Sequence, residues 1–172
     1  MIEKVIRKLE RAYTRRLRRD LSWAEVDRAA RFLRERDIRD GEEMFVPETW
    51  FYDIVLSMLR GSDVVLDVGA GDLRFALLAS RKVRKIYAVE VDPKIMSSAL
   101  RIISYDLPRN VIPICADARD VALPSDVTVI TCLMIHRSWT FPPEWLDKRI
   151  IYTKKHGVFV WDPSTRSYRR ER

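Results

Sequence analysis

The chain has 172 residues, of which 47% are hydrophobic and 33% charged, and its formal net charge is +7. This length fits one domain with a small appendage, and the basic balance favours an acidic partner. No apolar run reaches the roughly 18 residues of a membrane span, and the N-terminus is too charged for a secretory signal, so we expect a cytoplasmic protein with no membrane partner.

The basic charge is concentrated at the two ends of the chain. Residues 1–19 hold eight Lys or Arg against two acids, residues 163–172 hold four Arg against one Glu, and residues 20–162 have 20 basic and 22 acidic residues. Clustered cations of this kind are typical of nucleic-acid binding, and we expect the RNA contacts at Arg15, Arg16, Arg18 and Arg19. The alternative is a solvated helix face in a thermophile, because the chain has no Gln and one Asn.

Three helices are predicted before residue 62. Helical spacing of apolar residues covers 2–19, where Val5 and Leu9 belong to the buried stripe. Ser22 and Glu25 fit a capping box that opens a second helix to about residue 36. A third helix is predicted from 47 to 61. We therefore expect a basic helical extension over 1–46 and an α/β domain over 47–172.

From residue 63 onward, strand and helix patterns alternate. Strands are predicted at 64–68, 86–91, 111–115 and 127–133, helices at 72–81 and 93–104, then a short helix at 144–149 and a hairpin of 150–153 with 158–161. Continuous apolar runs between helices indicate a parallel sheet covered on both faces. Strand 64–68 should be central, and Cys115 and Cys132 should be buried free thiols too far apart to bridge.

The stretch "LDVGAGDLRF" places a glycine turn, Gly69-Ala70-Gly71, between a strand and a helix. Such a turn lets a ligand approach the backbone, and the amides of the helix are expected to point at it. A dinucleotide is disfavoured, because Arg74 replaces the third glycine of that fingerprint. The strand ends carry Asp67, Glu90 and Asp117. An acidic cleft suits a ligand with cationic groups, ribose hydroxyls and a base amine, and S-adenosylmethionine has all three.

Three segments, "VVLDVGAGD", "IYAVEVDP" and "NVIPICADARD", resemble in order and spacing the first three motifs of class I S-adenosylmethionine-dependent methyltransferases. The resemblance covers residues 63–133 and implies a reduced Rossmann-like fold with N-terminal helices. It implies that Asp67 and the loop Gly69, Ala70 and Gly71 hold the methionine end, that Glu90 binds the ribose hydroxyls and Asp117 the adenine amine, and that Ala118 lies near the ring. Many members have glycine where Leu73 stands.

The acceptor is less clearly indicated. Two of these segments look like the fibrillarin group of RNA methyltransferases, and "FVPETW" is similar to the approach to the core in small archaeal protein-lysine methyltransferases. We therefore expect methyl transfer to RNA; a protein-lysine acceptor, and a non-catalytic S-adenosylmethionine-binding or RNA-binding subunit, are the alternatives.

The stretch 131–143, after the fourth strand, should meet the acceptor, yet it lacks an Asn-Pro-Pro-Tyr motif and the acidic residue of fibrillarin-like enzymes. His136 is the candidate catalytic residue, as a proton acceptor for a hydroxyl, against a plain surface or capping role. Arg137 could pair with phosphate, and Trp139 and Phe141 could stack on a base or pack under the loop. No metal site is expected.

Overall fold

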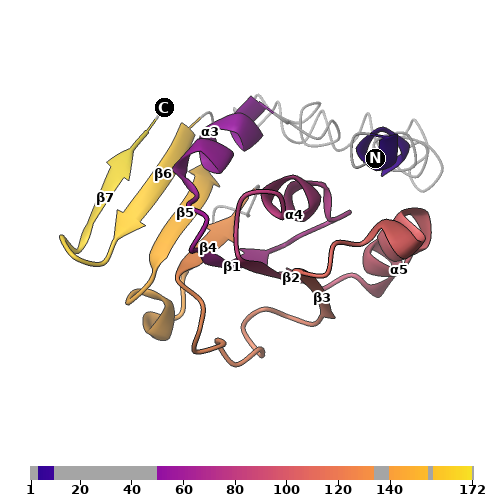
Figure 1. The fold of residues 1–172 in the computed structure, drawn as a ribbon. Helices are drawn as coiled ribbons and strands as arrows, with labels where there is room; N and C mark the ends of the chain where they lie inside the picture. The colour runs from indigo at the N-terminus through magenta and orange to yellow at the C-terminus, as the bar shows by residue number, and fades with distance from the viewer. Residues whose placement is uncertain (1–3, 10–49, 134–139, 155–156, 172) are drawn as a thin grey trace, which may run out of the picture.

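A computed structural model describes residues 4–9, 50–133, 140–154 and 157–171. They form a seven-stranded sheet of order β3-β2-β1-β4-β5-β6-β7 (Figure 1). The strands are β1 (Val64–Val68), β2 (Lys85–Glu90), β3 (Val111–Cys115), β4 (Val129–Cys132), β5 (Arg149–Lys154), β6 (Gly157–Asp162) and β7 (Ser167–Arg170).

The first five strands in the sheet order, β3 to β5, run parallel, as predicted. The expected hairpin is also present, because β6 pairs antiparallel with β5. Outside this hairpin, β7 adds a second antiparallel strand, which pairs with β6. β7 was not expected, because all four of its residues are exposed and show no alternation of apolar and polar side chains.

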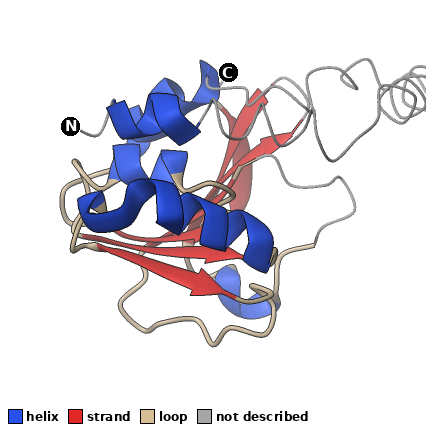
Figure 2. Ribbon diagram, turned by 90° about the vertical axis from the view of Figure 1, so that its right-hand side faces the viewer, coloured by secondary structure: helices blue, strands red, loops and turns tan. Residues whose placement is uncertain are grey.

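Three described helices lie together on one side of the sheet (Figures 1 and 2). They are α3 (Trp50–Met58), α4 (Arg74–Ala79) and α5 (Pro93–Ile103). The core on this side is built from Phe51 and Val55 of α3, Phe75 of α4 and Met96 of α5 against the sheet. No helix in the described part of the chain is long and apolar enough to cross a membrane.

The opposite face of the sheet is covered without long helices. A second cluster joins alternate residues of β1, such as Leu66, to Ala118 in the loop after β3 and to Trp145. Trp145 ends the 3-10 turn η3 (Pro143–Trp145), which replaces the helix expected at 144–149; a second such turn, η2 (Ser104–Asp106), follows α5. Both faces of β1 are therefore buried, which explains its uninterrupted apolar sequence.

The central position of β1 is confirmed, because β2 and β4 pair with its two sides. Cys115 on β3 and Cys132 on β4 are then three strand spacings apart, about 14 Å, and both thiols are free. The expected burial of both is wrong for Cys115, which is exposed. Cys115 is the last residue of β3, which lies at the edge of the sheet, so the apolar sequence around it does not imply burial.

The edge strand β3 also contains Pro113. Asn110 accepts a hydrogen bond from Ile86 of β2, and the Ala116 amide donates one to Glu90 of β2. Even-numbered residues of this strand therefore bond toward β2, since bonding directions alternate along a strand. Pro113 consequently faces the outer edge, where its missing N–H costs no ladder hydrogen bond.

The beginning of the chain joins the core on the helical side. Residues 4–9 are helical; Val5 and Leu9 are buried in the same cluster as α3 and α4, while Lys4, Arg7 and Lys8 are exposed. The four arginines Arg15, Arg16, Arg18 and Arg19 lie outside the described residues, as does the proposed domain boundary at 46/47. Both stay predictions.

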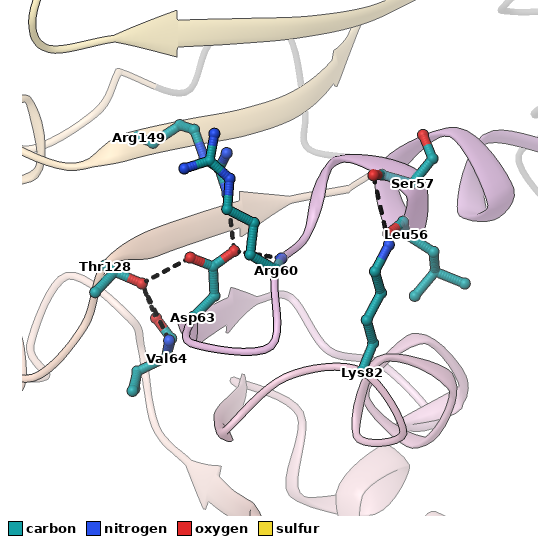
Figure 3. Close-up of polar contacts among 8 residues, drawn as sticks. All are labelled: Leu56, Ser57, Arg60, Asp63, Val64, Lys82, Thr128 and Arg149. Carbon is teal, nitrogen blue, oxygen red and sulfur yellow. Dashed lines mark hydrogen bonds and ion pairs between the residues drawn. The ribbon is translucent and has the colours of Figure 1, made fainter.

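A polar network fixes the amino end of β1 (Figure 3). The buried Asp63 carboxylate accepts hydrogen bonds from the Arg60 amide (2.8 Å), the Arg149 guanidinium (2.9 Å) and the Thr128 hydroxyl (3.3 Å). It thus ties the turn after α3 to the segment before β4 and to β5. At the other side of this turn, Lys82 donates to the Leu56 carbonyl at the end of α3 (2.6 Å), where a cation is favourable.

Candidate functional site

The glycine turn lies at the carboxyl end of β1, in the middle of the sheet. Gly69 and Gly71 have φ of +72° and +55°, a backbone region that residues with a Cβ rarely adopt. A Cβ built on Gly69 would meet nothing within 4 Å. The glycines are therefore required by conformation and not by crowding, and the space above Gly69 is open to a ligand.

The amides of this turn bond to the protein itself. Those of Gly69 and Ala70 both donate to the Val89 carbonyl at 2.9 Å, and that of Gly71 donates to the Glu90 carboxylate at 2.8 Å. These three turn amides are therefore occupied within the protein, whereas the expectation for the amides of the helix stays a prediction. A pyrophosphate requires such donors, so the turn is preformed for a different chemical group.

Leu73 precedes α4 in the left-handed conformation, with φ of +66° and ψ of +9°. This is the position at which many class I methyltransferases have glycine, and the positive φ gives the physical reason for that preference. Leu73 is fully buried in the core of the helical side. Burial of a leucine side chain contributes about 2–3 kcal/mol, which exceeds the 1–2 kcal/mol that the left-handed backbone costs.

This strain gives an expected result. Both Leu73→Ala and Leu73→Gly should destabilise the fold by about 2–5 kcal/mol through loss of buried side chain. Leu73→Gly should nevertheless be the more stable of the two by about 1 kcal/mol, because glycine relieves the strain. Urea denaturation of both variants measures the order. Ser97, an exposed position inside α5, is the control: Ser97→Gly should be less stable than Ser97→Ala by about 1 kcal/mol. If Leu73→Gly is also less stable than Leu73→Ala, the backbone at Leu73 is not strained.

Glu90 ends β2 and connects the glycine turn to the start of α5. One carboxylate oxygen accepts from the Gly71 amide and the other from the Asp92 amide (2.9 Å). Asp92 is in turn the N-cap of α5, where its side chain accepts from the Lys94 amide at 2.7 Å. Each Glu90 oxygen retains a second lone pair, so the side chain can fix the loop and still accept from a ribose hydroxyl.

Asp67 is the most deeply buried carboxylate of the site. Its Oδ1 accepts a hydrogen bond from the Thr131 hydroxyl (2.7 Å) on the paired strand β4, while its buried Oδ2 has no partner among the described residues. Burial raises the pKa of Asp67 to about 7; the Thr131 hydrogen bond opposes this rise and the charge of Glu90 adds to it. A buried, unpartnered carboxylate oxygen beside an open turn suits a cationic group of a ligand.

Sequence reasoning missed Thr131. The available signal was a single hydroxyl in the otherwise apolar strand β4, VITC, at the register position opposite the only acid of β1. A hydroxyl buried at that position requires an acceptor, and the neighbouring carboxylate supplies it.

Asp117 lies beside the end of β2, because the Ala116 amide donates to the Glu90 carbonyl at 3.1 Å. Arg119 donates to both carboxylate oxygens of Asp117 and lowers the pKa of Asp117 to about 2. This pair is at the surface, so an adenine amine would share or replace Arg119. Ala118 is buried in the core of the helix-free face.

The residues after β4 are only partly described. His136, Arg137 and Trp139 lie outside the described residues, so their roles stay predictions. Phe141 packs against Tyr152 with ring centroids 5.4 Å apart. Phe141 thus packs against the sheet, and its two proposed roles, base stacking and packing under the loop, stay predictions. Within the described ranges, no group of His, Cys, Asp and Glu is arranged to hold a metal ion.

Solved structures share the fold of this chain over about 60% of its length. The 23S rRNA methyltransferase ErmE is 17% identical with a TM-score of 0.50, covering 61% of this chain and 46% of its own. Precorrin-6y C5,15-methyltransferase from Geobacter metallireducens is 21% identical with a TM-score of 0.50, covering 62% and 63%. The YcgJ protein from Bacillus subtilis is 20% identical with a TM-score of 0.50, covering 59% and 48%. No protein-family model and no curated protein matches the sequence.

The fold is therefore that of the class I methyltransferases, with the strand order 3-2-1-4-5 and the glycine turn at the switch point of the sheet. An antiparallel hairpin and edge strand complete the sheet in place of a sixth parallel strand. The chain spans about half the length of the solved structures that it resembles.

Proposed function

We propose that the chain binds S-adenosylmethionine at the carboxyl end of β1 and transfers its methyl group to RNA. The observation that carries the cofactor assignment is the combination of an unpartnered Asp67 oxygen with a turn whose amides are already bonded. This arrangement offers negative charge and no phosphate donors. It thus suits the ammonium and sulfonium of S-adenosylmethionine and disfavours a dinucleotide.

Each residue then has one role. Asp67 and the turn Gly69–Gly71 face the methionine end, Glu90 accepts from the ribose hydroxyls, and Asp117 with Ala118 lies toward the adenine. When bound, the cofactor supplies an electrophilic methyl group. The remaining task of the chain is to hold an acceptor atom in line with it, which by itself supplies much of the rate. We propose His136 as the group that takes a proton from an acceptor hydroxyl.

The choice of RNA rests on charge. The fold does not decide the acceptor, because an rRNA methyltransferase and a precorrin methyltransferase both have it. The basic ends of this chain favour a polyanion, and the exposed Lys4, Arg7 and Lys8 continue the row proposed at Arg15, Arg16, Arg18 and Arg19. A protein-lysine acceptor is the alternative that the resemblance of "FVPETW" favours.

One experiment separates these functions. The protein is incubated with S-adenosylmethionine labelled in its methyl group, together with total RNA and a protein lysate. We expect label in RNA. Label in protein alone would replace the RNA acceptor by a lysine acceptor, and bound cofactor without transfer to either would leave a non-catalytic binding subunit.

The cofactor site has its own test. Glu90→Ala should weaken S-adenosylmethionine binding by about 1.5–3 kcal/mol, or roughly 10- to 150-fold, because it removes charge-assisted hydrogen bonds to the ribose and to the turn. Isothermal titration calorimetry measures the affinity. Asp106→Ala, a carboxylate of the 3-10 turn η2 that is exposed at the surface, is the matched control and should bind as the wild type does. Wild-type affinity in Glu90→Ala would remove Glu90 from the site.

A further inference from the structure

A group of aromatic side chains lies on the antiparallel end of the sheet, away from the glycine turn. Tyr152 of β5 stacks on Phe159 of β6 with ring centroids 5.4 Å apart and planes 21° apart. Tyr168 of β7 lies edge-on to Tyr152 at 5.9 Å and packs on Trp161 at 4.7 Å. Arg170 of β7 lies over the Phe159 ring at 6.0 Å. We call Tyr152, Phe159, Tyr168 and Arg170 the aromatic platform.

The platform is accessible from solvent. Tyr168 has 52% of its surface exposed, Arg170 is exposed, and Tyr152 and Phe159 are half-buried. Only Trp161 is buried, beneath Tyr168, where its ring nitrogen donates to the Leu146 carbonyl at 2.8 Å. The exposed ring of Tyr168 thus lies beside the partly exposed rings of Tyr152 and Phe159, and together they offer an aromatic surface to a ligand.

The strand register connects the platform to the cofactor site. Val68, the last residue before the glycine turn, is opposite Cys132, which is opposite Tyr152, then Phe159, then Arg170. Residues in register on neighbouring strands project to the same face. At about 4.8 Å per strand, Tyr152 is about 10 Å and Arg170 about 19 Å from Val68. The platform thus continues from the carboxyl edge of β1, where the methyl group is proposed to lie.

The charge of β7 and of its preceding turn is basic. Arg166, Arg169 and Arg170 are exposed there, against Glu171 at the end of the described chain. Arg169 pairs with Glu171 (2.5 Å) and alternates with Arg170 along the strand, so it projects to the other face. The cation beside the rings is therefore Arg170, and the combination of an exposed tyrosine ring with a neighbouring cation is typical of sites for unpaired nucleic-acid bases.

We propose that the aromatic platform binds unpaired bases of a single-stranded RNA, with Tyr168 as a stacking surface and Arg170 as a phosphate contact. This inference rests on the proposed function for the class of the acceptor, and it adds where that acceptor lies. The platform favours single strands, because a paired base cannot expose its face to a tyrosine ring. The bases that it holds flank the base or ribose presented to the cofactor.

The test measures binding of a 12-nucleotide single-stranded RNA of mixed sequence, and of its duplex, by fluorescence anisotropy without cofactor. Tyr168→Ala should raise the Kd for the single strand about 5- to 100-fold and leave the duplex Kd unchanged, whereas Tyr168→Phe should bind both as the wild type does. Arg170→Ser should reduce the slope of log Kd against log salt by about 0.7. Arg169→Ser, the same change on the opposite face of β7, is the control and should leave the slope within error.

The outcomes separate the platform from the proposed function. The platform is overturned if Tyr168→Ala binds the single strand within twofold of the wild type. It is also overturned if Arg169→Ser and Arg170→Ser reduce the salt slope equally. Transfer of labelled methyl to RNA is measured in parallel on the same variants. Transfer by Tyr168→Ala at the wild-type rate also removes the platform while the proposed function stands. If single-strand binding depends on Tyr168 but labelled methyl is transferred only to protein, the platform is retained and the proposal of an RNA acceptor is overturned.

Discussion

Asp67→Asn is expected to stabilise the protein at pH 8 by up to about 4 kcal/mol and to leave its stability at pH 4 nearly unchanged. The pKa of the wild-type carboxyl is raised to about 7, against 3.8 for the ordinary side chain. Keeping the buried carboxylate charged therefore costs about 4 kcal/mol of folding free energy. The asparagine retains an oxygen for the Thr131 hydroxyl and carries no charge to desolvate.

The direction of the pH effect follows from proton counts. Between about pH 4 and pH 7 the folded state keeps a proton on Asp67 and the unfolded state does not. Stability therefore falls as pH rises through this window, and the contribution is constant above the folded pKa. The other titrating groups are common to both proteins, so the difference between wild type and Asp67→Asn isolates this residue.

Urea denaturation of both proteins at pH 4, 5.5, 7 and 8 measures the difference. Asp53→Asn, at an exposed position of α3, removes one carboxylate without burial and is the matched control. Parallel pH profiles for wild type and Asp67→Asn would contradict a buried, protonated carboxylate at this position.

The same carboxylate is expected to make cofactor binding depend on pH. A ligand cation near Asp67 favours the ionised form, so wild-type affinity for S-adenosylmethionine should rise with pH up to about 7 and then level off. Asp67→Asn should bind more weakly and lose this dependence. A residue that lowers the stability of the ligand-free protein but strengthens ligand binding is typical of a functional site.

Asp63→Ala is expected to destabilise the fold by about 2–4 kcal/mol. Three donors from separate segments converge on this carboxylate: the Arg60 amide, the Thr128 hydroxyl and the Arg149 guanidinium. The Asp63 and Arg149 side chains are only 10% and 24% exposed, so removal of the acid leaves a partly buried cation without its acceptor, while the Thr128 hydroxyl keeps the Val64 carbonyl at 3.3 Å. Thermal and urea unfolding measure the loss.

A second ion pair supplies the control for this effect. Lys85 and Asp126 approach to 2.7 Å, but about a third of each side chain is exposed, 33% and 32%. Their pKa values move in the directions of a pair, because Lys85 donates to Asp126: that of Lys85 is raised and that of Asp126 lowered. Solvent screens such a pair, so Asp126→Ala should change stability little. Equal losses from Asp126→Ala and Asp63→Ala would show that burial does not decide the strength of these contacts.

Much of the fold could be predicted because its signals are local. The β1 and β3 bounds agree with the predicted strands residue for residue. β1 is a short apolar run between Asp63 and Gly69, and β3 is one that begins directly after Asn110, so each has few alternatives. The helix predicted at 93–104 ends one residue earlier, at Ile103. Its start is marked by Asp92-Pro93, an N-cap followed by proline at the first helical position.

The parts that could not be predicted depend on contacts distant in sequence. β7 has no apolar face, and it forms because β6 offers it a free edge. The left-handed Leu73 cannot be read from leucine, whose preference is for the ordinary helical region; tertiary packing overrides it. The Asp67–Thr131 hydrogen bond joins residues 64 positions apart, and only the register of β1 with β4 reveals it.

The two outer strands of the sheet bear on how copies of the chain meet each other. An unpaired strand edge is a template for adding a strand from another molecule, the first step of many aggregation pathways. At β3, Pro113 removes a donor on the outward side, and at β7, Arg169 and Arg170 would place like charges against any second copy that paired there. Both ends of the sheet thus oppose intermolecular β-pairing by different means, a missing hydrogen-bond donor at β3 and like charges at β7, and we expect concentrated protein to resist joining edge to edge.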